Sequence, residues 1–224
     1  MYKTKLCAML VQNEKTVPDI LDRWDAIKHI DVDCWGFKDV GLPMEDLRTL
    51  CQNMKATGKK VTMEIMTETK EEWINSAHFA VEAGVDDCMG GKFDKDVMKI
   101  LHDGGLTYYP FIGRIEGYPH MLHGTVEEIV GLAKEAVEGG ADGICLPIYR
   151  FLGDIDELTA ALLKEIKLPI VSAGTINSKE RIIESIHNGI AQLNIGSSYF
   201  SGDFAKGGDL AENIQNTVDW MKEA

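Results

Sequence analysis

The stretch "PIVSAGTINSKERIIESIHNGIAQLNIGSSYF", residues 169–200, decides the fold. It holds a short apolar run ending in small residues at Gly174, an amphipathic run ending at Gly189, and a second short apolar run ending at Gly196. A short apolar run followed by a longer amphipathic one is typical of a β-strand followed by an α-helix. The stretch therefore predicts a strand, a helix and a strand, with a turn of small residues after each strand.

The same alternation repeats about eight times along the chain, with no linker-like change of composition. The predicted strands are residues 5–12, 32–39, 60–66, 85–91, 106–114, 141–150, 168–174 and 191–198. Helices with start and stop signals are predicted for residues 16–27, 69–84, 124–140 and 177–189. This repeated alternation predicts a single α/β domain over residues 1–224, a closed (β/α)8 TIM barrel. An open doubly wound sheet is the alternative.

Composition limits the partners of the protein. The formal net charge is −13 and the pI is near 4.9, which argues against sequence-independent binding of nucleic acid or an anionic membrane. The apolar run near the N-terminus is too short for a secretory or membrane-spanning segment, so a cytoplasmic location is expected. The sequence leaves open whether the chain forms a homo-oligomer.

The five cysteines are an odd number and form no CxxC pair. They indicate neither a disulfide framework nor a thiolate metal site, and most lie in apolar runs, where free cysteine packs as a small hydrophobe. No metal and no cofactor is predicted.

The small-residue turns after the last two predicted strands favour a phosphate site. In a (β/α)8 barrel, ligands bind at the carboxyl ends of the strands, and the loops after strands seven and eight often hold phosphate. Backbone N–H groups can bind a dianion without a basic patch, which suits an acidic chain. The predicted phosphate-binding residues are Gly174, Thr175, Gly196, Ser197 and Ser198.

Over residues 169–200 the chain resembles the ribulose-phosphate-binding barrel superfamily, which contains sugar-phosphate epimerases, small aldolases and decarboxylases. The resemblance lies in the strand, the glycine-containing turn, the helix ending in glycine and the last strand running into Gly-Ser. It implies a small phosphorylated substrate. The sequence contains neither an "HxDxMDG" nor a "DxKxxD" signature, so the resemblance does not select one reaction.

Polar residues at the ends of predicted strands are the catalytic candidates. Glu64 lies within an apolar strand, where an isolated carboxylate is costly unless it is paired or functional, and it is the candidate general base. Lys38 ends the neighbouring predicted strand and could stabilise an enolate or form a Schiff base. A buried ion pair between Lys38 and Glu64 is the structural alternative.

Three further residues follow predicted strands. Lys92 is a second Schiff-base candidate, although it also fits a charged helix start. Arg114 is a catalytic candidate and Arg150 a substrate-binding one, because arginine suits bidentate binding of carboxylate or phosphate.

The long segment after the fifth predicted strand holds Glu116, His120 and His123. A lid, an oligomer contact and a metal site remain open for it, with the lid or contact favoured over the metal.

Three functions follow. The preferred one is an isomerase or epimerase of carbohydrate metabolism that moves a proton beside a carbonyl of a small phosphorylated sugar or sugar acid. The alternative is a Schiff-base aldolase, a lyase acting on a phosphorylated keto sugar. A non-catalytic sensor of a phosphorylated ligand ranks third.

Overall fold

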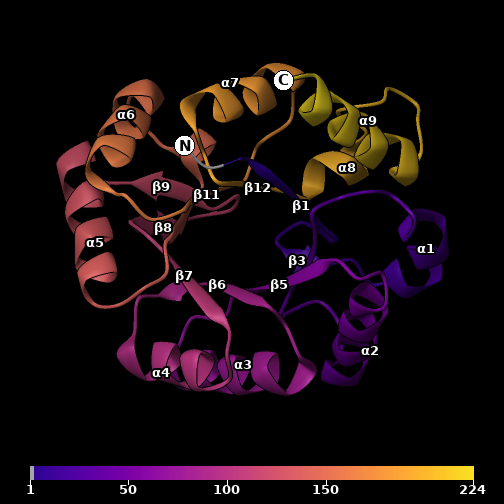
Figure 1. Cartoon of the computed structure of the whole chain (residues 1–224), viewed down its shortest axis with the longest axis horizontal. Coiled ribbons are helices and arrows are strands. Elements are labelled where there is room, and N and C mark those ends of the chain that lie inside the picture. Colours follow the sequence, from indigo (N-terminus) through magenta and orange to yellow (C-terminus); the bar gives the residue numbers. More distant parts are fainter. Residues whose placement is uncertain (1–2) are drawn as a thin grey trace.

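A computed structural model describes residues 3–224. Its centre is a closed barrel of eight parallel strands, surrounded by helices (Figure 1). The barrel strands are β1 (Lys5–Met9), β4 (Cys34–Lys38), β5 (Lys60–Ile65), β6 (Asp87–Lys92), β7 (Thr107–Phe111), β10 (Ile144–Leu146), β11 (Ile170–Ala173) and β12 (Gln192–Ile195). Because β1 pairs with both β4 and β12, the sheet has no open edge. The predicted barrel is confirmed, and the open sheet is excluded.

Helices connect successive barrel strands, and the last two helices follow β12. The helices are α1 (Ile20–Ile27), α2 (Met44–Lys55), α3 (Lys70–Ala83), α4 (Lys95–Asp103), α5 (Val126–Glu138), α6 (Ile155–Glu165), α7 (Lys179–Asn188), α8 (Ser197–Ser201) and α9 (Leu210–Glu223), with a 3₁₀ turn η1 (Ile148–Arg150). Capping boxes at Thr69 and Thr125 each satisfy two backbone N–H groups. Gly189 ends α7 in the left-handed conformation, as its position after the amphipathic run predicts.

Several predicted boundaries are wrong. The strands expected over residues 5–12, 141–150 and 191–198 end at Met9, Leu146 and Ile195. Two further boundaries have a common cause. The helix expected from residue 16 begins at Ile20, because Thr16 belongs to a short strand whose hydroxyl hydrogen-bonds to Lys38 of the barrel. The strand expected over residues 106–114 ends at Phe111, and Arg114 begins a separate hairpin. In both places, residues that the sequence pattern assigned to a longer helix or strand instead form an antiparallel hairpin outside the barrel.

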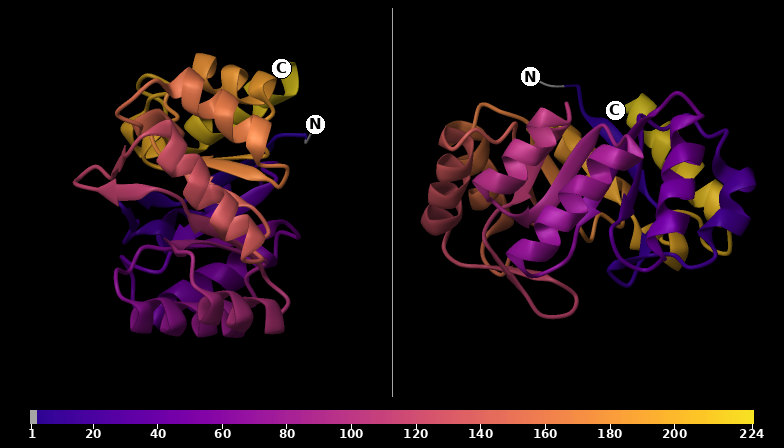
Figure 2. Two further views of the ribbon diagram at one scale, coloured as in Figure 1. Left: turned by 90° about the vertical axis from the view of Figure 1, so that its left-hand side faces the viewer. Right: turned by 90° about the horizontal axis from the view of Figure 1, so that it is seen from below.

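Two β-hairpins stand beside the barrel. One joins β2 (Val11–Gln12) to β3 (Lys15–Thr16), and the other joins β8 (Arg114–Glu116) to β9 (Met121–His123). The β8–β9 hairpin projects from the body of the molecule (Figure 2). It follows β7 at the carboxyl end of that strand, so it rises at the end of the barrel where ligands bind.

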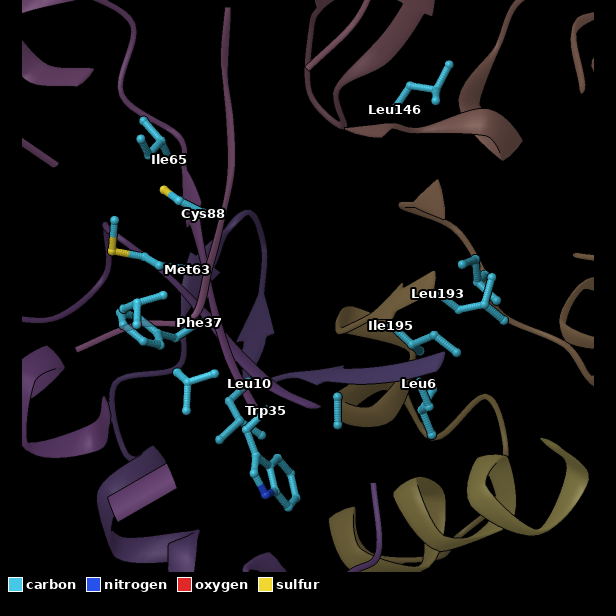
Figure 3. Packing of buried hydrophobic residues seen from close by; sticks show 14 of the residues in the cluster. Leu6, Leu10, Trp35, Phe37, Met63, Ile65, Cys88, Leu146, Leu193 and Ile195 are labelled. Carbon is cyan, nitrogen blue, oxygen red and sulfur yellow. The ribbon is translucent and has the colours of Figure 1, made fainter. Parts of the chain in front are cut away.

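Side chains alternate between the two faces of each strand. On β4 and β5, Trp35, Phe37, Met63 and Ile65 pack in the apolar layer between strands and helices (Figure 3), where full burial of each stabilises the fold by roughly 1.5–3 kcal/mol. The intervening residues face the barrel interior. The strand period of two therefore places the polar side chains of β4 and β5 inside the barrel.

All five cysteines are buried and free, in agreement with their apolar setting in the sequence. Across residues 3–224, no helix combines the length and apolarity that a membrane crossing requires.

We expect Gly143→Ala to destabilise the protein by about 1–3 kcal/mol. A Cβ there would lie 2.3 Å from the carbonyl oxygen of Pro169, which is fixed because it accepts a hydrogen bond from Ile144 N at 3.0 Å. The matched control is Gly131→Ala in α5, where a Cβ meets nothing within 4 Å and should stabilise by about 0.5–1 kcal/mol. Denaturant unfolding measures both, and equal unfolding free energies would contradict the packing described for Gly143.

Candidate active site

Lys38 and Glu64 form a buried ion pair at the carboxyl ends of neighbouring strands. Lys38 is the last residue of β4, and the register of β4 and β5 pairs it directly with Glu64. Lys38 Nζ lies 3.2 Å from Glu64 Oε2, and only 6% of each side chain is exposed. The buried ion pair that the sequence offered as the structural alternative is present, and the catalytic roles of the two residues stay predictions. Burial of both charges requires further partners, because removing two ions from water costs several kcal/mol per ion.

Glu14 supplies one of those partners. It stands at the tip of the β2–β3 hairpin, in a two-residue turn where Asn13 and Glu14 have φ of 52° and 60°. Its carboxylate accepts a hydrogen bond from Lys38 Nζ at 2.6 Å and another from Arg150 Nη1 at 2.7 Å. Glu14 was not among the residues predicted from the sequence. The one local signal in "VQNEKT", residues 11–16, was Asn13, because asparagine tolerates the left-handed conformation of a turn.

The charges of this group reinforce one another. Burial lowers the pKa of the Lys38 ammonium, but the carboxylates of Glu64 and Glu14 outweigh burial and raise that pKa above its ordinary value. Burial raises the pKa of Glu14, but Lys38 and Arg150 outweigh it and bring the pKa down to about 2. Near neutral pH, Lys38 is therefore an ammonium and Glu14 a carboxylate.

Arg150 links this ion cluster to the turn after β11. It ends η1, and its Nε donates to Thr175 Oγ1 at 2.8 Å. Thr175 has a φ of 55°, which costs free energy for a β-branched residue, and Arg181 of α7 donates to its carbonyl oxygen at 2.6 Å. Glu14 and Thr175 are thus two strained residues held by hydrogen bonds from arginines, a pattern that concentrates at functional sites.

A cavity of about 220 Å³ lies over these groups. It brings together most of the site residues predicted from the sequence: Lys38, Glu64, Arg150, Gly174, Thr175, Gly196, Ser197 and Ser198. Glu14, His120 and Asn194 also line it. The cavity has one wall of paired charges and another of small residues.

The small-residue wall depends on Gly196. A Cβ at this position would lie 2.4 Å from Val11 Cγ2 and 3.3 Å from Met9 Cβ, so glycine lets the chain pass close to the first strand and enter α8. Ser197 and Ser198 form the first turn of α8, and the N–H groups of a first helical turn have no acceptor within the helix. Ser197 and Ser198 line the same cavity as Gly174 and Thr175.

Two predicted catalytic residues lie elsewhere. Lys92 is exposed at the end of β6 and lines a neighbouring cleft of about 470 Å³, which shares Met66, Phe111, Ile115 and His120 with the first cavity. Arg114 is exposed on β8 and pairs with Glu116 at 3.0 Å. The structure does not bring either residue to the Lys38–Glu64 pair, so their catalytic roles remain predictions.

His120, near the tip of the β8–β9 hairpin, reaches the site. Its Nδ1 lies 3.9 Å from Glu14 Oε2, and its carbonyl oxygen lies 3.4 Å from Arg150 Nη1. Within the described part of the chain, no three His, Cys, Asp or Glu side chains gather as metal ligands would. Through His120 the hairpin reaches one side of the cavity, and its role as a lid or an oligomer contact stays a prediction.

The described geometry defines a (β/α)8 barrel with a polar cavity at the carboxyl ends of its strands. Among solved structures, the chain is similar to orotidine 5'-phosphate decarboxylase from Pyrococcus horikoshii OT3, with 13% identity over 97% of this chain and 99% of that one and a TM-score of 0.70. It is also similar to N-acetylmannosamine-6-phosphate 2-epimerase from Clostridium perfringens, with 16% identity, 87% and 86% coverage and a TM-score of 0.61. A third is the YdjI aldolase from Escherichia coli K12, with 17% identity, 98% and 89% coverage and a TM-score of 0.60.

These likenesses confirm the barrel fold that the resemblance to ribulose-phosphate-binding barrels implies. No family model matches the sequence, and no curated protein matches it. The chemistry must therefore be inferred from the residues of this chain.

We expect Glu14→Gln to lower the free energy of unfolding by on the order of 3 kcal/mol near neutral pH, because the pKa of Glu14 falls from 4.5 to about 2 on folding. A carboxyl whose pKa is depressed stabilises the fold above its unfolded value and loses that contribution as pH falls. The difference between wild type and variant should therefore shrink between pH 4.5 and about 2. Urea unfolding of both proteins across this range measures it, and a difference independent of pH would contradict the ion pairing.

Proposed function

We propose that the protein is an isomerase or epimerase that transfers a proton beside a carbonyl group of a small phosphorylated sugar. The observation that carries the proposal is the pairing of the Glu64 carboxylate with the Lys38 ammonium, 3.2 Å apart on the wall of the cavity. A carboxylate can take a proton from carbon, and an adjacent ammonium can stabilise the negative charge that the carbonyl oxygen then acquires. Both groups arise from rigid strand ends, which fixes their relative geometry.

In the proposed reaction, the Glu64 carboxylate accepts the proton of the carbon beside the carbonyl. The electron pair of the broken C–H bond forms the enolate, whose oxygen accepts a hydrogen bond from Lys38 Nζ. Return of the proton to a carbon of the enolate gives the isomer or epimer, and Glu64 is again a carboxylate. The balance requires no oxidant, reductant or metal.

Phosphate binding by the small-residue wall of the cavity would hold the substrate in place. The turn at Gly174 and Thr175 and the turn from Gly196 to Ser198 line the same cavity as Lys38 and Glu64. The chain carries a net charge of −13, so the attraction for a dianion must come from nearby peptide N–H groups and hydroxyls. Arg150, which donates to Thr175, adds a positive charge close to these groups.

The aldolase alternative is less well supported. A Schiff base forms from a neutral amine, whereas Lys38 contacts two carboxylates that raise the pKa of its ammonium. Lys92 is exposed but lines the neighbouring cleft. A protein that binds a phosphorylated ligand without turnover would not require the buried Lys38–Glu64 pair, so the sensor ranks third.

We expect Glu64→Gln to reduce proton exchange about 10²–10⁴-fold, the usual contribution of a positioned acid–base group. The assay incubates phosphorylated ketoses, aldoses and sugar acids with the protein in D2O and measures deuterium at the carbon beside the carbonyl by mass spectrometry. Glu68→Gln, in the neighbouring cleft, is the control and should retain exchange. Full exchange by Glu64→Gln would remove Glu64 from the mechanism, and a borohydride-trapped adduct on Lys38 or Lys92 would favour the aldolase.

We expect Ser197→Asp to weaken binding of glycerol 3-phosphate at least about 10-fold, because a carboxylate in the first turn of α8 would repel the phosphate. Gln52→Glu, an exposed change on α2, adds the same charge away from the cavity and should leave the affinity unchanged. Isothermal titration calorimetry measures both. Equal affinities for the two variants would place the phosphate elsewhere.

A further inference from the structure

The carboxylate of Glu14 occupies an anion site built by two cations. Oε2 accepts a hydrogen bond from Lys38 Nζ at 2.6 Å, and Oε1 accepts one from Arg150 Nη1 at 2.7 Å. The side chains are largely buried, with 6% of Lys38, 14% of Arg150 and 17% of Glu14 exposed. One carboxylate thus spans two cations on the wall of a cavity open to ligand.

Each cation keeps other partners when Glu14 is removed. Lys38 also contacts Glu64, and Arg150 also donates to Thr175 Oγ1. Removing Glu14 would take from these cations only the two hydrogen bonds that its carboxylate accepts. Another carboxylate could replace both and leave the charge of the cluster unchanged, whereas a neutral group would leave two buried cations sharing one carboxylate.

The hairpin would let the Glu14 carboxylate leave the two cations without unpairing its strands. Its base is anchored, because the Thr16 hydroxyl accepts from Lys38 N at 2.8 Å and Thr16 N donates to Val40 O at 2.9 Å. The strained backbone is confined to the two tip residues, whose φ angles are 52° and 60°. Rotation of the Glu14 side chain alone would vacate the site while the hairpin stays paired.

This anion site adjoins the proposed phosphate site. Arg150 touches Glu14 through Nη1 and Thr175 through Nε, so one guanidinium lies between the two. A cavity of about 220 Å³ suits one small molecule that carries both anionic groups.

We propose that Glu14 occupies, in the free protein, the place of a substrate carboxylate, and that the substrate is a phosphorylated sugar acid. The inference rests on the proposed function for the phosphate half of the ligand. Binding exchanges the carboxylate of Glu14 for that of the ligand on Lys38 and Arg150. Glu14 thereby competes with the ligand carboxylate for Lys38 and Arg150, and only a ligand with a carboxylate can replace it on both cations.

The test compares two probes by isothermal titration calorimetry at neutral pH. Glycerol 3-phosphate carries a phosphate alone, and 3-phosphoglycerate carries a phosphate and a carboxylate. Removal of the competing side chain in Glu14→Gln should tighten binding of 3-phosphoglycerate about 10- to 100-fold, the effect of charge-assisted hydrogen bonds. Binding of glycerol 3-phosphate should change far less, so the ratio of the two affinities should rise.

Two variants complete the design. Asp203→Asn removes an exposed carboxylate that lines the same cavity, and it should raise both affinities equally if it acts at all. Glu14→Gly removes the carboxylate and relieves the positive φ, so it should reproduce the selectivity of Glu14→Gln if the glutamine variant proves unstable.

An unchanged or lower ratio of affinities in the folded Glu14 variants would overturn the inference and make Glu14 a fixed support for Lys38 and Arg150. If Asp203→Asn raised the ratio of affinities as much as the Glu14 variants do, the inference would also be overturned. The tighter binding of 3-phosphoglycerate would then result from the lower overall negative charge. Absence of glycerol 3-phosphate binding in every protein would instead contradict the proposed phosphate site. The two failures are therefore distinguishable.

Discussion

The buried ammonium of Lys38 is the interaction on which the site depends. Its Nζ lies 2.6 Å from Glu14 and 3.2 Å from Glu64, which come from a hairpin tip and from a neighbouring barrel strand. Burial alone would favour the neutral amine of Lys38, so the charged form depends on the two carboxylates beside it. Arg150 balances the second carboxylate, and the cluster of two cations and two anions has no net charge.

The barrel can hold such a buried charged cluster because its strands place apolar side chains on one face and polar side chains on the other. Each strand directs alternate side chains toward the helices, where the large apolar layer forms, and the other side chains toward the barrel interior. Because the strands are parallel, their carboxyl ends meet at one end of the barrel, and Lys38 and Glu64 arrive there side by side. The loops after β11 and β12 arrive at the same end with small residues.

Most of this arrangement can be predicted from the sequence. Eight apolar runs predict the eight strands, and a glutamate between apolar neighbours predicts an inward-facing Glu64. Glu14 is missed because its placement depends on a two-residue turn outside the barrel, which continues an apolar run without any glycine to mark it. Arg114 is misplaced for a related reason: the strand period predicts where β7 runs but not that it stops at Phe111. Hairpin pairing is set by contacts between segments, and these leave little trace in local periodicity.

The protonation state of Lys38 tests the account most directly, because proton transfer requires an ammonium there and a Schiff base requires a free amine. Two-dimensional ¹H–¹⁵N NMR of the lysine Nζ groups, assigned with Lys38→Met, follows this group as the pH is raised. We predict that the Lys38 ammonium signal persists to a pH above 10.5, the ordinary pKa of lysine, because the carboxylates of Glu14 and Glu64 favour the charged form. Loss of the proton at a pH below 10.5 would contradict the account, because burial would then outweigh both carboxylates.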